Sequence, residues 1–149
     1  MINHKALKTY QATQVTTAKP EKILLLLYEG CLKFIRTAKL RLEEKKTAEK
    51  GKNISKAIAV VSELVNTLDH SVGSELSHDL EALYLFVIDK LIEANMKNEK
   101  EGLEIAERIL LTLYEGWQDV INNPRPDGTP SPTLQPELHA TFAQAQAKK

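Results

Sequence analysis

The sequence has only one cysteine, no excess of charge of either sign, and a single proline before residue 124. Cys31 has no second cysteine with which to form an internal disulfide. The 20 basic and 20 acidic residues give a formal net charge of zero, whereas general nucleic-acid binding needs an excess of basic residues on one face. We therefore expect neither a disulfide framework nor a nucleic-acid partner.

Long apolar segments are missing as well. No apolar run approaches the roughly 20 residues needed to cross a bilayer. Residues 1–10 contain neither the apolar core nor the small-residue cleavage site of a signal peptide. These features are typical of a soluble, cytoplasmic protein with no membrane insertion.

Sequence signatures of catalysis and metal binding are also missing. There is no Gly-rich phosphate loop, no Ser-His-Asp set and no Cys-His pair. Residues 75–78 have the Glu-x-x-His spacing of di-iron bundles, but such sites need two of these motifs and two further glutamates. The motif occurs once, so we expect it to lie on the surface. We expect no enzymatic activity, no metal and no cofactor.

What the sequence does contain is a long stretch without proline, between Pro20 and Pro124, as helix interiors require. Apolar residues recur there at three- and four-residue steps, which predicts four amphipathic helices. The connectors predicted between them are residues 43–52, a break at Gly73 and Ser74 with Ser77 as N-cap of the third helix, and residues 98–102. The main apolar positions are Ile23, Leu27, Cys31, Phe34, Ile35, Ala38 and Leu42; Ile54, Ala57, Ile58, Val61, Leu64, Val65 and Leu68; Leu80, Leu83, Tyr84, Val87, Leu91 and Ala94; and Leu103, Ala106, Ile109, Leu110, Leu113, Trp117, Val120 and Ile121.

The fold predicted from this pattern is all-α, an antiparallel four-helix bundle with short connections. We expect three parts: an N-terminal cap segment at 1–19, the bundle at 20–123, and a flexible Pro-rich tail at 124–149. Leu138 and Phe142 in the tail are compatible with a short terminal helix, which the pattern alone does not establish.

The predicted helices carry more apolar surface than one core-facing stripe requires. In the third helix Leu85, Ile88 and Ile92 lie beside the main stripe, so that the apolar arc covers more than half of the circumference. One interpretation is that the helices are central or that the bundle dimerises. The other is an exposed groove for an amphipathic partner. The pattern alone leaves both open.

A short motif, Leu-Tyr-Glu-Gly, occurs at 27–30 in the first predicted helix and again at 113–116 in the fourth. Glycine in a helix interior costs about 1 kcal/mol relative to alanine, so close approach of two helices would explain its presence. Chance similarity between two leucine-rich helices is the alternative, and we assign the motif no function.

The order of landmarks along the chain resembles the FliS family of flagellin export chaperones. The resemblance covers residues 10–123, although Lys19 and Ser74 depart from the family's usual serine and glycine. The tail after Pro124 has no counterpart. The matching residues are Tyr10, Val15, Thr17, Ala18, Pro20, Lys22, Ile23, Leu27, Tyr28, Gly30, Phe34, Ile35, Ala38, Gly73, Glu75, Leu80, Leu83, Tyr84, Leu91, Ala94, Asn95 and Trp117.

This resemblance implies a chaperone that binds the disordered C-terminal segment of flagellin, prevents its premature polymerisation and keeps it competent for type III export. It also implies that Tyr10 and Val15 belong to a movable N-terminal cover over the binding groove. Further partners expected from the resemblance are the flagellar export gate and a regulatory protein. From the apolar pattern we expect the groove contacts at Ile58, Val61, Val65, Leu85, Ile88 and Ile92. The alternative is a structural homodimer that buries the same surface.

Overall fold

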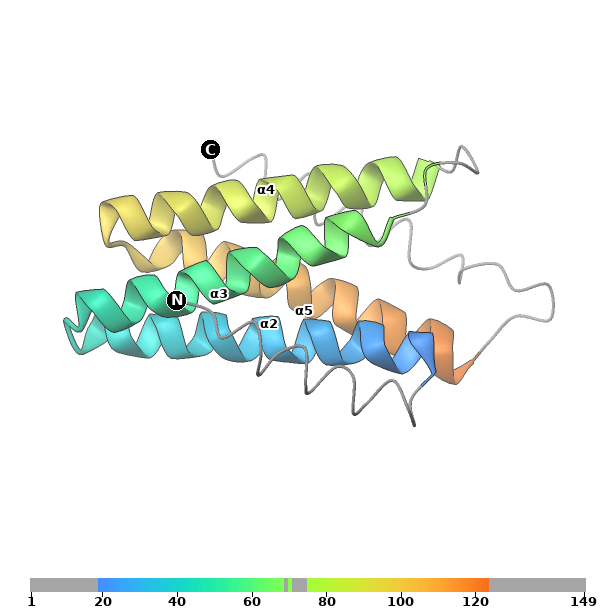
Figure 1. The fold of residues 1–149 in the computed structure, drawn as a ribbon, viewed down its shortest axis with the longest axis horizontal. Coiled ribbons are helices and arrows are strands. Elements are labelled where there is room, and N and C mark those ends of the chain that lie inside the picture. Colours follow the sequence, from blue (N-terminus) through green and yellow to red (C-terminus); the bar gives the residue numbers. More distant parts are fainter. Residues whose placement is uncertain (1–18, 69, 71–74, 124–149) are drawn as a thin grey trace.

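The computed structural model describes residues 19–68, 70 and 75–123, which form four α-helices and no strand. The helices are α2 (Pro20–Glu43), α3 (Thr47–Asn66), α4 (Glu75–Lys97) and α5 (Lys100–Asn122). They form a ring in which α2 packs against α3 and α5, and α4 packs against the same two helices (Figure 1). Successive helices run antiparallel along the long axis (Figure 1). The predicted antiparallel four-helix bundle is confirmed.

Three of the predictions made from sequence fall outside the described residues. These are the N-terminal cap segment with Tyr10 and Val15, the break at Gly73 and Ser74, and the Pro-rich tail.

The core of the bundle consists of the apolar residues that recur at helical spacing. Because one face of each helix points to the bundle axis, these residues are removed from water, and each large one contributes about 1.5–3 kcal/mol. The fully or almost fully buried members include Cys31, Ile35 and Ala38 of α2; Ile54, Ala57, Val61 and Leu64 of α3; Leu83, Val87 and Leu91 of α4; and Leu103, Ala106, Leu110 and Leu113 of α5.

The connections at one end of the bundle are tighter than the sequence predicted. The chain passes from α2 to α3 within residues 44–46, and from α4 to α5 within residues 98–99. Each connection contains one residue in the left-handed conformation, Lys45 with φ 60° and Asn98 with φ 53°. One such residue ends a helix abruptly. The predicted connectors 43–52 and 98–102 were therefore too long, since lysine and glutamate are good helix formers and continue the helices.

The helix starts also differ in part from the prediction. Pro20 is the first residue of α2, where its missing N–H costs nothing. Lys19 precedes it in extended conformation and makes no side-chain cap, as expected from its departure from the family's serine. The predicted N-cap Ser77 was wrong, because α4 already begins at Glu75.

Candidate partner-binding surface

The four edges of the ring, where neighbouring helices meet the solvent, are closed by different side chains. At the α2–α5 edge, Glu107 accepts hydrogen bonds from Arg36 Nε at 2.7 Å and from Lys39 Nζ at 3.2 Å. At the α2–α3 edge, the Lys56 ammonium lies 5.6 Å from the centroid of the Phe34 ring. Charged side chains thus cover both edges of α2.

The two edges of α4 are different, because none of the ion pairs between described residues joins α4 to α3 or to α5. Of these two, the α3–α4 edge is the one at which the sequence predicts partner contacts. Polar contacts mark only its two ends. At one end Lys50 Nζ donates to the backbone oxygen of Asn95 at 3.0 Å. At the other, beyond α3, His70 Nε2 lies 2.9 Å from Glu81 Oε2. The stretch between these ends combines the apolar side chains of Ile58 and Ile88 with small residues of α3, two of them serines.

The alignment of α3 and α4 follows from their contact near Lys50. A Cβ atom placed on Gly51 would lie 3.5 Å from Asn95 Oδ1, so these positions face each other. Seven residues make about two helical turns and return to the same face. Because the helices are antiparallel, Ile58 on α3 comes opposite Ile88 on α4. Both are partly buried and pack against the core. We call the surface around them, between α3 and α4, the candidate groove, because the sequence predicts the partner contacts here.

The α4 side of this groove is an exposed apolar stripe. Leu85 is 49% exposed and Ile92 is 43% exposed, and they lie on one line, about two turns apart. Ile88 lies between them, and Met96, 79% exposed, continues the line one turn further. We call Leu85, Ile92 and Met96 the α4 stripe. The exposed carboxylate of Asp89 interrupts this line between Leu85 and Ile92. Large apolar side chains at this exposure are typical of interaction surfaces.

The α3 side of the groove consists of small, uncharged residues. Ser55, Ala59 and Ser62 are spaced at four and three residues, on the side of α3 that turns towards α4. Small side chains let another helix approach closely, while the α4 stripe offers it large apolar contacts. The α3–α4 edge therefore combines exposed apolar residues on α4 with small residues on α3, a chemistry that suits an amphipathic helix.

The predicted site residues divide into three groups. Leu85 and Ile92 are exposed, and Ile58, Val65 and Ile88 are partly buried at the same groove. Val61 is fully buried in the core, so its side chain is not accessible to a partner in this conformation. Tyr10 and Val15 lie outside the described residues. Sequence reasoning missed Met96, although its position four residues after Ile92 continues the same line.

An aromatic cluster joins α2, α4 and α5, towards the end of the bundle opposite the tight connections. The hydroxyl groups of Tyr28 and Tyr84 are hydrogen-bonded to each other, and Trp117 Nε1 donates to the Tyr28 hydroxyl at 3.1 Å. Tyr114 stacks on Tyr28 with ring centroids 6.4 Å apart. Burial raises the pKa of Tyr84 to about 12 and that of Tyr28 well above its usual range. Both hydroxyls are therefore protonated at neutral pH, and they hold α2, α4 and α5 together.

Cys31 is a second buried group with reactive chemistry. Burial raises the pKa of its thiol to about 12, and the thiol contacts the backbone oxygen of Ala57 at 3.6 Å. A thiol that stays protonated and is fully buried is a poor nucleophile. Cys31 thus belongs to the core.

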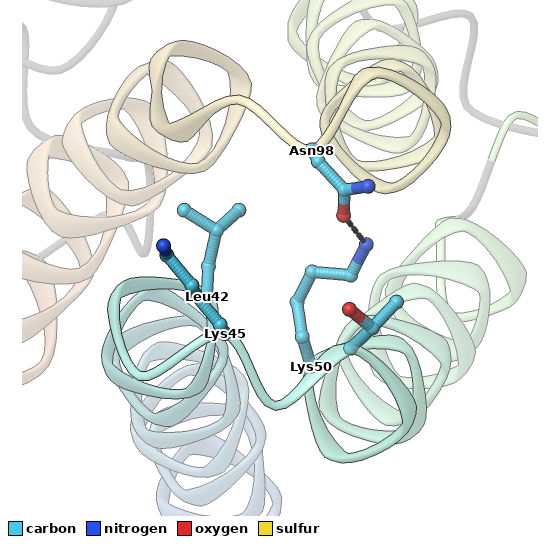
Figure 2. Close-up of a pocket in the computed structure, with 5 residues that line it drawn as sticks. Leu42, Lys45, Lys50 and Asn98 are labelled. Carbon is cyan, nitrogen blue, oxygen red and sulfur yellow. Dashed lines mark hydrogen bonds between the residues drawn. The ribbon is translucent and has the colours of Figure 1, made fainter.

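The tight connections enclose a small opening of about 410 Å³, lined by Leu42, Lys45, Thr47, Lys50 and Asn98. Figure 2 shows the Lys50 side chain reaching across it to Asn98. Lys50 is only 2% exposed, and its ammonium binds the C-terminal end of α4, where backbone carbonyls lack helical partners. The opening is therefore occupied by a structural contact between the two connections.

Neither metal binding nor membrane insertion finds support in the described part of the chain. Within residues 19–68, 70 and 75–123, no group of three His, Cys, Asp or Glu side chains is placed to hold a metal ion. None of the helices α2 to α5 combines the length and apolar character of a membrane span.

Comparison with known proteins places the chain among flagellar proteins. Residues 2–124 match the family model described as flagellar protein FliS. A flagellar secretion chaperone FliS of Bacillus subtilis is 36% identical over 118 residues, which are 79% of this chain and 87% of the relative. The flagellar secretion chaperone FliSB of Pseudomonas aeruginosa is 35% identical over 124 residues, 80% of this chain and 98% of the relative. The Campylobacter jejuni FliS is 32% identical over 123 residues, 83% of this chain and 96% of its own.

Proposed function

This chain belongs to the FliS family of flagellar secretion chaperones, and on that premise we propose that it binds the disordered C-terminal segment of flagellin in the cytoplasm. Binding would keep flagellin from polymerising prematurely and hold it competent for type III export. The relatives are named chaperones, a non-enzymatic role, and we propose no catalytic activity for this chain. The flagellar export gate and a regulatory protein are further proposed partners.

The observation that supports this proposal is the exposed apolar surface at the α3–α4 edge. Ile58, Ile88 and Val65 are partly buried there, and the α4 stripe is exposed beside them. A disordered client that folds on binding loses conformational entropy, so it needs a large apolar contact to offset that loss. Amphipathic helices bind such grooves through apolar residues spaced at three, four and seven positions. The groove offers apolar side chains at this spacing.

The N-terminal segment has a place in the same proposal. The family resemblance implies that Tyr10 and Val15 cover the binding groove and move when the client arrives. We propose this role for them in this chain. The cover and the client would then compete for one apolar surface.

The test is calorimetric titration of the full chain with the C-terminal segment of its own organism's flagellin. We expect one-to-one binding with a large negative heat-capacity change, the mark of apolar burial. Leu85→Lys should weaken binding about 4- to 12-fold, which corresponds to about 0.75–1.5 kcal/mol, because Leu85 is already half buried and only its exposed half is buried on binding. Its circular dichroism should remain helical, since Leu85 is half exposed in the free protein.

Leu40 provides a matched control for this substitution. It is a leucine of similar exposure, 52% against 49%, but it lies on α2, away from the α3–α4 groove. Leu40→Lys should leave the affinity unchanged. If both variants bind as the parent does, the α4 stripe is not the client site. If the unmodified chain does not bind and light scattering shows a stable dimer, the stripe is an oligomer interface instead.

A further inference from the structure

Most of the tail after α5 lies outside the family match. The family match ends at residue 124, and the P. aeruginosa relative is matched over 98% of its own length by only 80% of this chain. Residues 125–149 therefore lie beyond the family match. Proline is confined to the first half of the tail, with Pro136 the last.

We propose that residues 134–147 bind in cis on the α4 stripe, and that the tail thereby occupies the outer side of the α3–α4 groove. The occupant is part of the same molecule, so that its binding does not depend on protein concentration.

The sequence of this segment suits the stripe. Leu134, Leu138, Phe142 and Ala145 follow one another at steps of four, four and three residues, which places them on one face of a helix. Pro136 falls in the first turn of this segment, where the missing N–H costs no helical hydrogen bond. No proline or glycine follows it, and alanine, the best helix former, is frequent in residues 137–149. The segment therefore has one apolar face, the complement that an exposed apolar stripe needs.

The length of the tail also fits. Since α4 and α5 are antiparallel, α5 ends at the end of the bundle where α4 begins (Figure 1). From that end, Leu85 lies about 15 Å and Met96 about 32 Å along α4, at 1.5 Å per residue. The Pro-rich linker 124–133 spans about 31 Å at 3.1 Å per residue. Residues 134–145, as a helix, then extend about 17 Å, which equals the distance from Leu85 to Met96.

Tethering explains how a short segment can hold this surface. A helix of about 12 residues is marginal in isolation. A short flexible tether, however, gives an effective concentration in the millimolar range, so that a weak contact is still populated. The tail would thus shield the stripe and yield to a tighter partner. Only this last consequence rests on the proposed client function, whereas the contact itself does not.

Disulfide trapping in the full chain tests the contact without any client. Asp89 is exposed and lies between Leu85 and Ile92 on α4, and Thr141 precedes Phe142. A disulfide needs Cα atoms within about 7 Å. Because docking would hold the tail against α4, mild oxidation of Asp89→Cys/Thr141→Cys should form an intramolecular disulfide. The buried Cys31 does not compete.

The matched control is Arg108→Cys/Thr141→Cys. Arg108 is exposed on α5, about 22 Å from the end that carries the tail, while Asp89 is about 21 Å from the same end. The tether alone gives the tail cysteine a similar effective concentration near both positions, and docking raises it near position 89 only. We therefore expect the disulfide at position 89 to form at least about tenfold faster than the disulfide at position 108. Adding Leu138→Ser and Phe142→Ser should remove the difference.

Equal rates at the two positions would overturn the proposal, and so would a rate at position 89 that the serine substitutions do not change. Disulfides formed mainly between molecules, at a rate that rises with protein concentration, would also overturn it and assign the stripe to a second copy. Because no flagellin is present, each of these results is distinct from a failure of the proposed client binding.

Discussion

Three helical glycines provide the sharpest test of the packing, because the same substitution should have opposite effects at different positions. Gly30 lies within α2 with open space around it, so that an added Cβ would meet nothing within 4 Å. At Gly51 of α3 the nearest atom would be Asn95 Oδ1 at 3.5 Å, an ordinary contact. At Gly102 of α5 a Cβ would overlap the backbone carbonyl of Lys90 on α4 and lie 3.0 Å from Ala94 Cβ.

The expected magnitudes follow from these surroundings. Alanine is favoured over glycine in a helix by about 0.5–1 kcal/mol, so Gly30→Ala and Gly51→Ala should raise the free energy of unfolding by that amount. Gly102→Ala gains the same local preference, but it forces α5 away from the α4 backbone. Overpacking of this kind costs about 1–3 kcal/mol, and we expect the upper end because a carbonyl oxygen cannot rotate aside as a side chain does.

The assay is urea unfolding followed by circular dichroism, with the midpoint and slope compared among the three variants. Gly102→Ala should unfold at a lower urea concentration than the parent, and the other two at higher concentrations. An increase in stability for Gly102→Ala equal to that of Gly30→Ala would refute the close contact between α4 and α5.

Two further stability measurements address the buried polar groups. Lys50→Met should lower the free energy of unfolding by about 1–3 kcal/mol, because it leaves the Asn95 carbonyl without its buried donor, whereas Lys52→Met, on the exposed face of the same helix, should change it by less than about 0.5 kcal/mol. Burial raises the pKa of Tyr84 from 10.0 to about 12 and that of the Cys31 thiol from 9.0 to about 12. As the pH rises, the unfolded chain therefore loses these two protons before the folded chain does. The free energy of unfolding, which is at its full value below pH 9, should fall by about 3–4 kcal/mol between pH 8 and pH 11. Urea titrations at the two pH values measure this loss, which should be smaller in Cys31→Ala.

The helices and the core were predictable because burial follows from periodicity. Most positions at three- and four-residue steps in the four helices are buried, Cys31 among them, whereas others such as Phe34 and Val65 are only partly buried. The ends of the helices were less predictable. Lysine and glutamate signal exposure but not an end of a helix, so the polar run after Glu43 was assigned to a connector although most of it is helical. One left-handed residue, Lys45, makes the turn instead.

The glycines show a related limit of sequence reasoning. The repeated motif directed attention to Gly30 as a place of close helix approach, and the structure shows open space there. The close approach occurs at Gly102, which was assigned to a connector. Which glycine meets a neighbouring backbone depends on how two helices are aligned, and the apolar period of each helix does not contain that information.

The same limit applied to the candidate groove. The pattern identified Leu85 and Ile92 as lying beside the core stripe, and both are exposed. It also included Val61, which is fully buried. A wide apolar stripe contains both buried core residues and exposed residues at its margin, and the sequence does not tell them apart. The contact between Gly51 and Asn95 shows which face of α3 turns to α4, and so which residues of α3 lie at this edge.

The ring arrangement gives the excess apolar surface of α4 a physical meaning. Each helix has two neighbours, so one side of every helix faces solvent. On α2 that side carries a single large apolar residue above one-third exposure, Leu40, whereas on α4 it carries Leu85, Ile92 and Met96 in a row. A central position in the bundle cannot explain this row, since α4 has no third neighbour among the described helices. The remaining occupants differ in kinetics. A cis segment, whether the N-terminal cover or the tail, binds at a rate independent of concentration, a second copy binds at a rate that rises with concentration, and a client binds only when added. The dependence of stripe protection on concentration therefore distinguishes these three classes, and the Leu138→Ser and Phe142→Ser substitutions separate the tail from the cover.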